Sequence, residues 1–302
     1  MIDLHSLAKI LREITAEEIQ VLQTLEDNAH RFEYVPVDEV TKSLNIDKDN
    51  VLFLLGKLNK QKLVRRKSEN YLGYRMSQAG HDALALYDLA LKDFVVALGH
   101  PYGVGKEATV YRGQNANGDE IAVKFLRWGR TSFRRVRRHR TLKDESGSSW
   151  MDLSKQAAER EFAALRKMHD CGGKVPEPIA INRHIIIMSK MTGDLLLQVL
   201  ELRNASNVLE QILNQAYLAY HKAELIHGDL SEYNIIVNEQ EEITIFDWPQ
   251  WQPITHPNAL WLLKRDLTHL LTFFKRQFGI KRDVNEVFNK IIAQSSGTFN
   301  NA

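Results

Sequence analysis

Residues 225–248, the stretch LIHGDLSEYNIIVNEQEEITIFDW, contain two aspartates, Asp229 and Asp247, and an asparagine, Asn234, five positions after the first aspartate. Asp229 and Asn234 lie five positions apart in a polar turn, and Asp247 follows two runs of β-branched residues. A hairpin formed by those two runs would return the chain, so that Asp247 faces the other two side chains. Oxygen ligands with open coordination positions suit Mg²⁺ or Mn²⁺ rather than zinc. The stretch therefore predicts a divalent-metal site, and the simpler alternative is a polar surface hairpin.

The segment HGDLSEYN has the D-x-x-x-x-N spacing of a protein-kinase catalytic loop. In such a loop the aspartate accepts the proton of the incoming hydroxyl and the asparagine binds a metal ion. This spacing makes Asp229 the candidate catalytic residue, and Asn234 and Asp247 the candidate metal ligands.

Two upstream features predict a site for a nucleotide. The segment GVGKEATVY, residues 103–111, carries glycines that let backbone N–H groups approach phosphate oxygens, although a short Gly-x-Gly is a weak signal alone. A hairpin predicted around Asn117 and Gly118 ends in IAVK, where Lys124 could meet the α- and β-phosphates. A buried lysine needs a charged partner, and Glu161 lies on the apolar face of a helix predicted over 152–169. In this order the motifs predict a kinase-like phosphotransferase.

The elements ahead of this site form a separate small domain. Thr15 and Glu18 make a capping box before a predicted helix, and two further helices and two strand-like runs follow. Three helices with a two-stranded wing predict a winged helix-turn-helix. Its third helix and wing carry a basic set that suits a phosphate backbone: Lys57, Lys60, Lys62, Arg65, Arg66 and Lys67. The alternatives are a solvated helix face or a protein-docking unit.

We therefore predict an α+β fold with a winged-helix domain followed by a minimal bilobal kinase-like domain. The predicted boundaries are 1–92 for the winged helix with its connecting helix, 93–189 for the N-lobe and 190–302 for the C-lobe. The N-lobe includes a flexible basic loop over 127–150.

The composition is that of a soluble globular protein, with 302 residues of which 44% are hydrophobic and 26% charged. The net charge of +2 is uneven, because residues 127–143 hold eight Lys and Arg and no acidic residue. This window predicts one anionic partner surface. The single cysteine, Cys171, excludes an intrachain disulfide, and no signal peptide or membrane span is evident. We expect a cytoplasmic protein that is a monomer when free.

The segments GVGKEATVY, HGDLSEYN and FDWPQ resemble the glycine, catalytic and metal loops of the Rio kinase family. The winged helix is similar to that of the family's Rio-two branch, so the resemblance covers nearly the whole chain. It implies an ATP- and Mg²⁺-dependent serine/threonine kinase and ATPase, acting in late maturation of the small ribosomal subunit. The short C-terminus would fit an archaeal source. The implied partners are a ribosomal subunit precursor and its rRNA, contacted through the winged helix and residues 127–143.

The resemblance also implies roles for individual residues. Asp247 would be a metal ligand and a candidate acceptor that becomes phosphorylated itself, and Ser132 or Ser146 would match an autophosphorylation site. Asp266 would brace the catalytic loop from below. The implied nucleotide-binding set is Gly103, Val104, Gly105, Lys106, Glu107, Val110, Lys124, Glu161, Met188 and Lys190.

Departures from ordinary protein kinases limit these expectations. HGD replaces H-R-D, DWP replaces D-F-G, and only 55 residues follow Asp247, without an A-P-E motif. Phosphorylation of peptides in the ordinary manner is therefore not expected. Two alternatives stay open: a small-molecule kinase of the aminoglycoside or choline type, and a nucleotide-switched nucleic-acid-binding protein with little turnover. For His227 and for Trp248, Trp251 and Trp261 we expect roles in packing.

Overall fold

The computed structural model describes residues 3–105, 107–127 and 150–293. The chain divides into two compact units, Met1–Leu98 with Asn115–Asn117, and Gly99–Gln114 with Gly118–Ala302. The first break therefore falls six residues after the predicted boundary at 92. Lys106, Ser132, Ser146 and the basic window beyond Arg127 lie outside the described residues, so the expectations for them remain predictions.

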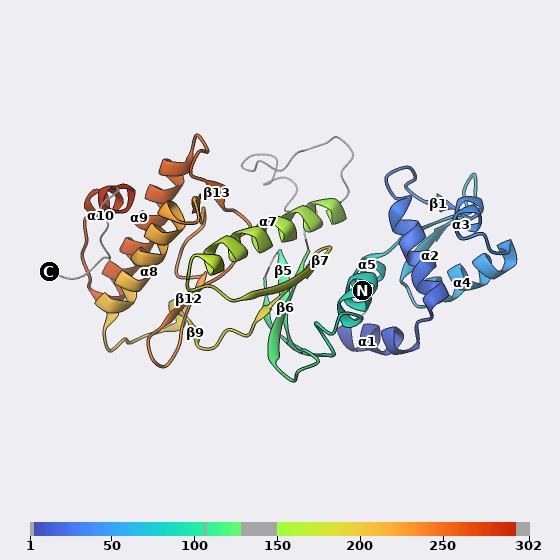
Figure 1. Ribbon diagram of the computed structural model, residues 1–302, viewed down its shortest axis with the longest axis horizontal. Coiled ribbons are helices and arrows are strands. Elements are labelled where there is room, and N and C mark those ends of the chain that lie inside the picture. The colour runs from blue at the N-terminus through green and yellow to red at the C-terminus, as the bar shows by residue number, and fades with distance from the viewer. Residues whose placement is uncertain (1–2, 106, 128–149, 294–302) are drawn as a thin grey trace. The chain divides into compact units, whose positions relative to one another are not determined.

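The first unit is the expected winged helix with an additional helix at each end (Figure 1). Its elements are α1 (Leu4–Glu13), α2 (Ala16–Asp27), β1 (Val35–Pro36), α3 (Val37–Leu44), α4 (Lys48–Lys60), β2 (Val64–Lys67), β3 (Gly73–Met76) and α5 (Gln78–Ala90). The sheet order is β1-β3-β2, and β2 and β3 form the antiparallel wing. Both halves of the Thr15–Glu18 capping box are present. The apolar faces of α2, α3 and α4 meet in a buried core, as their periodicity predicted.

The second unit begins with an antiparallel sheet that carries the lysine strand. The sheet order is β4-β5-β6-β8-β7, with β4 (Ala97–Val104), β5 (Ala108–Gln114), β6 (Glu120–Leu126), β7 (Pro178–Asn182) and β8 (Ile185–Ser189). β6 is the central strand and six of its seven residues are buried. Helix α7 (Trp150–Asp170) packs against β6, β7 and β8 (Figure 1). Because Lys124 lies on β6 and Glu161 on α7, this packing brings the two charges together.

The rest of the second unit is mainly helical and holds the two loops of interest. It contains β9 (Asp194–Leu195), a short 3₁₀ turn (Leu196–Gln198), α8 (Ala205–His221), β10 (Leu225–Ile226), β11 (Ile235–Val237), β12 (Ile243–Ile245), β13 (Gln252–Pro253), α9 (Ala259–Phe278) and α10 (Val284–Ile292). β11 and β12 form the predicted hairpin, in register from Ile235 opposite Ile245. The catalytic-type loop, residues 227–234, therefore precedes β11, and the metal-type loop, residues 246–251, follows β12.

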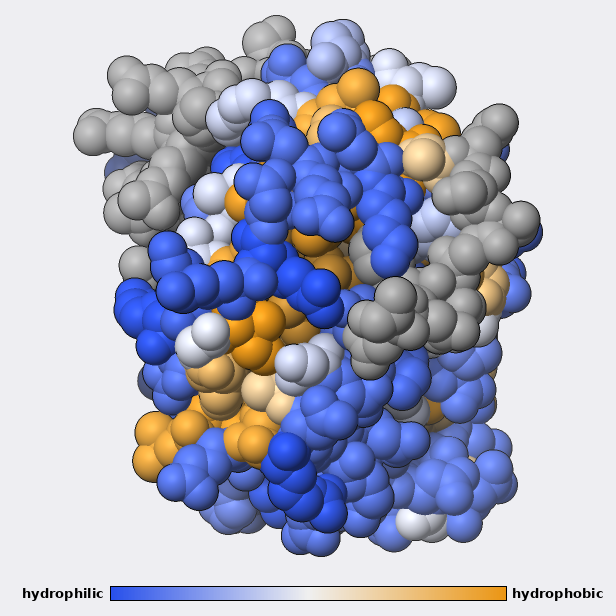
Figure 2. Space-filling view, turned by 90° about the vertical axis from the view of Figure 1, so that its left-hand side faces the viewer, coloured by the Kyte–Doolittle hydropathy of each residue, from blue (hydrophilic) through white to orange (hydrophobic). Residues whose placement is uncertain are grey.

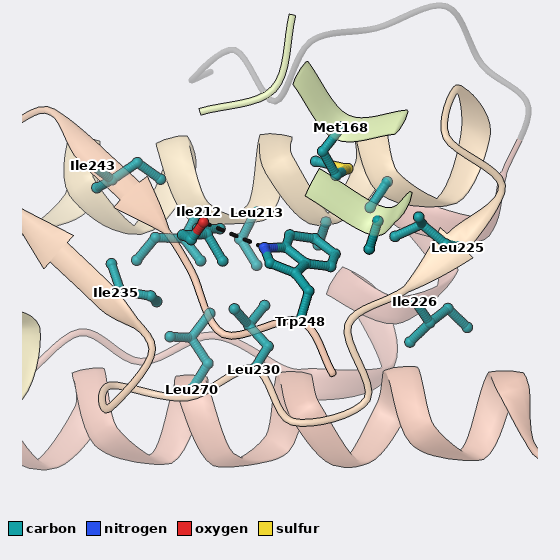
Figure 3. Close-up of a cluster of buried hydrophobic side chains, with 14 of the residues drawn as sticks. Met168, Ile212, Leu213, Leu225, Ile226, Leu230, Ile235, Ile243, Trp248 and Leu270 are labelled. Atoms are coloured by element: carbon teal, nitrogen blue, oxygen red, sulfur yellow. Dashed lines mark hydrogen bonds between the residues drawn. The ribbon is translucent and has the colours of Figure 1, made fainter. Parts of the chain in front are cut away.

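Trp248 anchors the metal-type loop in the main hydrophobic core (Figure 3). It is 2% exposed, and its indole N–H donates to the Ile245 carbonyl at 3.3 Å. Side chains from α7, α8 and α9 surround the ring, including Met168, Ile212 and Leu270. Burying an indole of this size stabilises the fold by about 3 kcal/mol or more. Contacts with three helices thus hold Trp248, the residue that follows Asp247, in place.

The surface at the α8–α10 end is mainly hydrophilic, with hydrophobic residues in smaller separate areas (Figure 2). Among the described residues no helix has the length and hydropathy needed to span a membrane. Trp248 is a core residue as expected and Trp251 is half-buried, but Trp261 is 64% exposed, so the expectation of packing was wrong there.

Candidate active site

Lys124 is the centre of the site. Its ammonium lies 2.6 and 2.8 Å from the two carboxylate oxygens of Glu161 and 2.6 Å from Oδ1 of Asp247. Lys124 and Glu161 are almost completely buried, while 42% of the Asp247 side chain is exposed. The ion pair expected between Lys124 and Glu161 is therefore present, and one ammonium serves two carboxylates.

Burial and the neighbouring charges both shift the pKa values of Lys124 and Glu161. Burial alone would lower the pKa of Lys124, but the carboxylates of Asp247 and Glu161 outweigh it and raise that pKa above its ordinary value. Burial raises the pKa of Glu161, Lys124 opposes this effect, and the negative charge of Asp247 adds to it. Lys124 is accordingly a permanent cation. Two carboxylates competing for it leave the cluster with an excess of negative charge that a further cation would relieve.

The two loops lie side by side through backbone and side-chain hydrogen bonds. The Asn234 amide donates to the backbone carbonyl of Asp229 at 2.7 Å, and the Phe246 N–H donates to the Asn234 carbonyl at 3.0 Å. Gln250 donates to Oδ2 of Asp229 at 3.4 Å. The structure thus brings together the two loops that carry Asp229, Asn234 and Asp247. Gln250 ends the FDWPQ motif, but nothing in the local pattern shows that its side chain reaches back to Asp229.

Backbone conformation directs Asp247 toward Lys124. Asp247 has φ of 65°, in the left-handed region that non-glycine residues seldom adopt. The anchored Trp248 on one side and β12 on the other hold this conformation. Strain of this kind costs about 1–3 kcal/mol and persists only where the surroundings impose it. The carboxylate is therefore placed by the fold and does not depend on a favourable local conformation.

Gly228 explains why HGD replaces H-R-D. Its φ is 75°, and a Cβ added there would lie 2.6 Å from the carbonyl oxygen of Gln250. No side chain fits at this position, because the metal-type loop crosses directly over it. An arginine comes instead from α9, since Arg265 donates to the Gly228 carbonyl and also to Asp266. Asp266 thus contacts the catalytic-type loop through Arg265, a residue that sequence reasoning missed.

His227 lies behind the loop and makes contacts typical of packing. One ring nitrogen is 3.2 Å from the Phe246 carbonyl oxygen, and the ring contacts that of Trp248 in a tilted arrangement with 4.4 Å between centroids. Burial lowers the pKa of His227, although Asp266 opposes the shift. His227 Nδ1 and Asp266 Oδ2 have no hydrogen-bond partner among the described residues, and both side chains line a cavity of about 20 Å³. That is enough room for one water molecule.

Of the expected nucleotide-contacting residues that the structure describes, Glu161 lies on α7 and the others lie on or directly beside β4, β5, β6 and β8. Val110 pairs directly with Lys124 across the sheet, and the Gly105 N–H donates to the Ala108 carbonyl at 2.8 Å. Gly103 is partly buried, Val104 is 76% exposed, and the Glu107 carbonyl accepts from the Arg127 N–H. Met188 is buried in β8. The Lys190 ammonium pairs with Glu120, and the expected contact of Lys190 with the nucleotide remains a prediction.

A second connection joins α7 to the end of the metal-type loop. The Arg160 guanidinium donates to the Trp251 carbonyl at 2.6 Å, and the Trp251 indole donates to the Arg160 carbonyl at 2.7 Å. Arg160 and Lys167 also lie over the Trp251 ring, at 5.0 and 5.6 Å from its centroid. The sequence indicated packing for Trp251 but not its contact with Arg160, because the two residues lie 91 positions apart.

The oxygen-rich donor set suits a hard divalent cation. Asp247 and the side-chain oxygen of Asn234 are the candidate ligands, and Asp229 is exposed. Among the described residues no group of three or more His, Cys, Asp or Glu side chains forms a metal site of its own. A site made of one aspartate and one asparagine would leave several coordination positions for phosphate oxygens, as Mg²⁺ requires.

The fold and the site define the class: a winged-helix domain joined to a minimal protein-kinase-like domain. A model of the RIO domain matches residues 109–287, and a model of the Rio2 N-terminal region matches residues 11–92. The chain belongs to the RIO family, in its Rio2 branch.

Relatives across archaea and eukaryotes agree with this assignment. The chain is 38% identical to the RIO-type serine/threonine-protein kinase Rio2 of Methanocaldococcus jannaschii over 86% of this chain and 98% of the relative. It is 35% identical to serine/threonine-protein kinase rio2 of Dictyostelium discoideum over 90% of this chain, which is 52% of that relative. The chain thus spans nearly all of the archaeal protein but about half of the amoebal one.

A solved structure is similar over almost the full chain. It is the crystal structure of the Rio2 kinase–ADP/Mg²⁺–phosphoaspartate complex from Chaetomium thermophilum, with a TM-score of 0.79 and 32% identity. The match covers 95% of this chain and 89% of that chain.

Proposed function

We propose that this protein is an ATP- and Mg²⁺-dependent phosphotransferase, acting as an ATPase and serine/threonine kinase. The observation that carries the proposal is the cluster in which buried Lys124 meets Glu161 while it also contacts Asp247. The names of the relatives and the ADP/Mg²⁺ complex of the Chaetomium protein support it. The match of residues 11–92 to Rio2 favours this assignment over a small-molecule kinase.

The residues divide the chemistry among them. Lys124 would hold the phosphates, Glu161 would hold Lys124, and Asp229 would accept the proton of an attacking hydroxyl or water. Asn234 and Asp247 would bind Mg²⁺, which when bound neutralises charge on the phosphates. The contact between Asp247 and Lys124 would loosen when phosphate oxygens compete for the ammonium, and this would leave Asp247 free to bind the metal.

Asp247 is also a candidate phosphoryl acceptor. Its carboxylate is partly exposed and lies beside the lysine that would orient the phosphates. The phosphoaspartate in the Chaetomium complex supports this role. In such a step an Asp247 oxygen bonds to the γ-phosphorus, the bond to the departing ADP breaks, and water later releases the phosphate.

Labelling in a single turnover distinguishes phosphoryl transfer to Asp247 from phosphoryl transfer to a serine. With γ-labelled ATP and Mg²⁺, label on Asp247 is an acyl phosphate that hydroxylamine removes, whereas label on serine resists it. We expect hydroxylamine-labile label in the wild type and none in Asp247→Asn. We expect Asp229→Asn to lower turnover by about 10²–10⁴-fold, the usual contribution of general base catalysis.

Asp170→Asn is the matched control, because Asp170 is exposed at the end of α7. Turnover in Asp229→Asn equal to that of Asp170→Asn would contradict the proposal.

The proposed setting is maturation of the small ribosomal subunit in the cytoplasm. The wing would contact rRNA through Arg65 and Arg66, which are exposed on β2. Lys57 differs from its basic neighbours, because it pairs with the buried carboxylate of Glu18 at 3.0 Å. Copurification of the protein with small ribosomal subunits, lost on addition of ATP and Mg²⁺, tests this setting. Equal copurification with both ribosomal subunits would contradict it.

A further inference from the structure

The contacts around Lys124 form a closed ring. Lys124 binds Glu161, whose neighbour Arg160 binds Trp251, and Trp251 lies four positions after Asp247 in the chain. Asp247 in turn binds Lys124. The ring passes through β6, α7 and the metal-type loop, so each of its contacts constrains the other two.

Trp251 is built into this ring by contacts of two kinds. Its indole N–H and its carbonyl exchange hydrogen bonds with the backbone and the guanidinium of Arg160. The indole ring of Trp251 lies under two cations, Arg160 and Lys167, which are about two helical turns apart on the same side of α7. Trp251 therefore fixes both the distance of the loop from α7 and its position along the helix.

Core packing holds α7 on a different side. Its apolar residues in the main core are Ala157, Ala158, Ala164, Leu165 and Met168. Three of these five residues are alanines, whose small side chains interlock less with neighbouring elements than larger side chains do. Directional hydrogen bonds at Arg160 resist sliding or rotation of α7, which would carry Glu161 away from Lys124.

We propose that Arg160 and Trp251 are positioning residues that hold Glu161, Lys124 and Asp247 in the arrangement needed for phosphoryl transfer. This inference rests on the proposed function. In ordinary protein kinases the corresponding lysine–glutamate pair depends on the activation loop and on the position of the helix that carries the glutamate. Here a contact within the chain would hold the helix that carries Glu161 against the loop that carries Asp247, because Trp251 belongs to that loop.

A double-mutant cycle tests the pair. We expect Trp251→Ala and Arg160→Ala each to lower kcat for ATP hydrolysis by about 10–100-fold, the effect of misplacing reacting groups by a fraction of an ångström to an ångström. KM for ATP should change much less, because neither residue lies in the expected nucleotide-contacting set. The double variant should be no slower than the slower single variant. Losses that multiply would overturn the pairing.

Conservative and control variants separate positioning from general damage. Trp251→Phe keeps a ring beneath the cations but loses the indole donor, and we expect an intermediate kcat. Arg166→Ala removes an exposed arginine from the same helix and should leave kcat within about twofold of the wild type. If Trp251→Ala does not fold, Trp251→Phe and Arg160→Ala still complete the test. Wild-type kcat in both would overturn the proposal.

Hydrogen–deuterium exchange provides a readout that does not depend on turnover. We expect the amides of residues 157–165 to exchange at least tenfold faster in Trp251→Ala, with those of α8 unchanged. Unchanged exchange in α7 would overturn the inference even if the enzyme is active. If the wild type hydrolyses no ATP, the proposed function fails, while faster exchange in α7 would still support the role of Trp251 in holding that helix.

Discussion

At the scale of single residues, the site is governed by one buried cation and its partners. Lys124 would be expensive to bury alone, and its contact with two carboxylates makes burial possible. Removing one partner of such a buried pair commonly costs about 3–5 kcal/mol, because the other charge is left without compensation. His227, unlike Lys124, is buried as a neutral side chain, in contact with the Phe246 carbonyl and the Trp248 ring.

The neutral state of His227 leads to a prediction for stability against pH. Burial lowers its folded-state pKa, whereas the unfolded value is about 6.5. Between these values the unfolded chain binds a proton that the folded chain does not, so the free energy of unfolding falls as pH decreases below about 6.5. We expect denaturant unfolding from pH 7.5 to 5 to show a smaller decrease in His227→Gln than in the wild type.

His269→Gln is the matched control, because His269 is exposed on α9. Its decrease over the same pH range should equal that of the wild type. If the free energy of unfolding falls equally with pH in His227→Gln and His269→Gln, His227 does not cause the pH dependence.

At the scale of elements, the two loops owe their geometry to the strands and helices on either side. β11 and β12 bring the ends of the loops together, and Trp248 fixes one of them in the core. The crossing of the loops is close enough that position 228 has to be glycine. Arg265 on α9 then supplies a guanidinium to the Gly228 carbonyl from outside the loop.

The close crossing predicts a large penalty for Gly228→Ala. A left-handed conformation costs an L-residue about 1–2 kcal/mol, and the Cβ contact with the Gln250 carbonyl adds to this cost. Gly172 is a matched control, since its φ is 77° and an added Cβ there would meet nothing within 4 Å. We expect Gly228→Ala to lower the free energy of unfolding by about 2 kcal/mol more than Gly172→Ala in denaturant melts. Equal losses would show that backbone conformation alone requires the glycine.

At the scale of the whole molecule, the chain combines a unit with an exposed basic wing and a unit with a buried charged site. Family models match both units, so the combination is a property of the Rio2 branch. Of the six basic residues noted in the third helix and wing, Lys57 is engaged with Glu18 and Lys67 is half-buried, whereas Lys60, Lys62, Arg65 and Arg66 are exposed, two of them on strand β2 of the wing. The wing is thus the better candidate for phosphate contact.

Contact of the wing with RNA predicts a change in salt dependence. Each phosphate contact contributes about 0.7–0.9 to the slope of log affinity against log salt. We expect replacement of Arg65 and Arg66 by alanine to weaken binding of the full chain to a hairpin RNA and to reduce the slope by roughly 1.4–1.8. Lys9 and Lys92, exposed on other parts of the same unit, provide a double-alanine control of equal charge. Equal changes in slope for the two double variants would indicate a general charge effect.

Much of this architecture was predictable from the sequence, because the relevant signals are local. The capping box at Thr15, the hairpin before Lys124 and the five-residue spacing of Asp229 and Asn234 depend on residues close together in the chain. Glu161 was identified because its helix has a clear apolar face. Such patterns constrain backbone conformation directly, and they led correctly to the fold and family.

Tertiary structure alone decided how these residues are held. The Arg160–Trp251 contact, the crossing of Gln250 over Gly228 and the guanidinium of Arg265 join segments between 22 and 91 positions apart. No local feature of the sequence distinguishes Arg160 or Arg265 from the other arginines. The partner of each is decided by how whole helices and loops pack together. The sequence by itself determined which groups could perform the chemistry, and the packing of α7 and α9 against the two loops determined which residues position them.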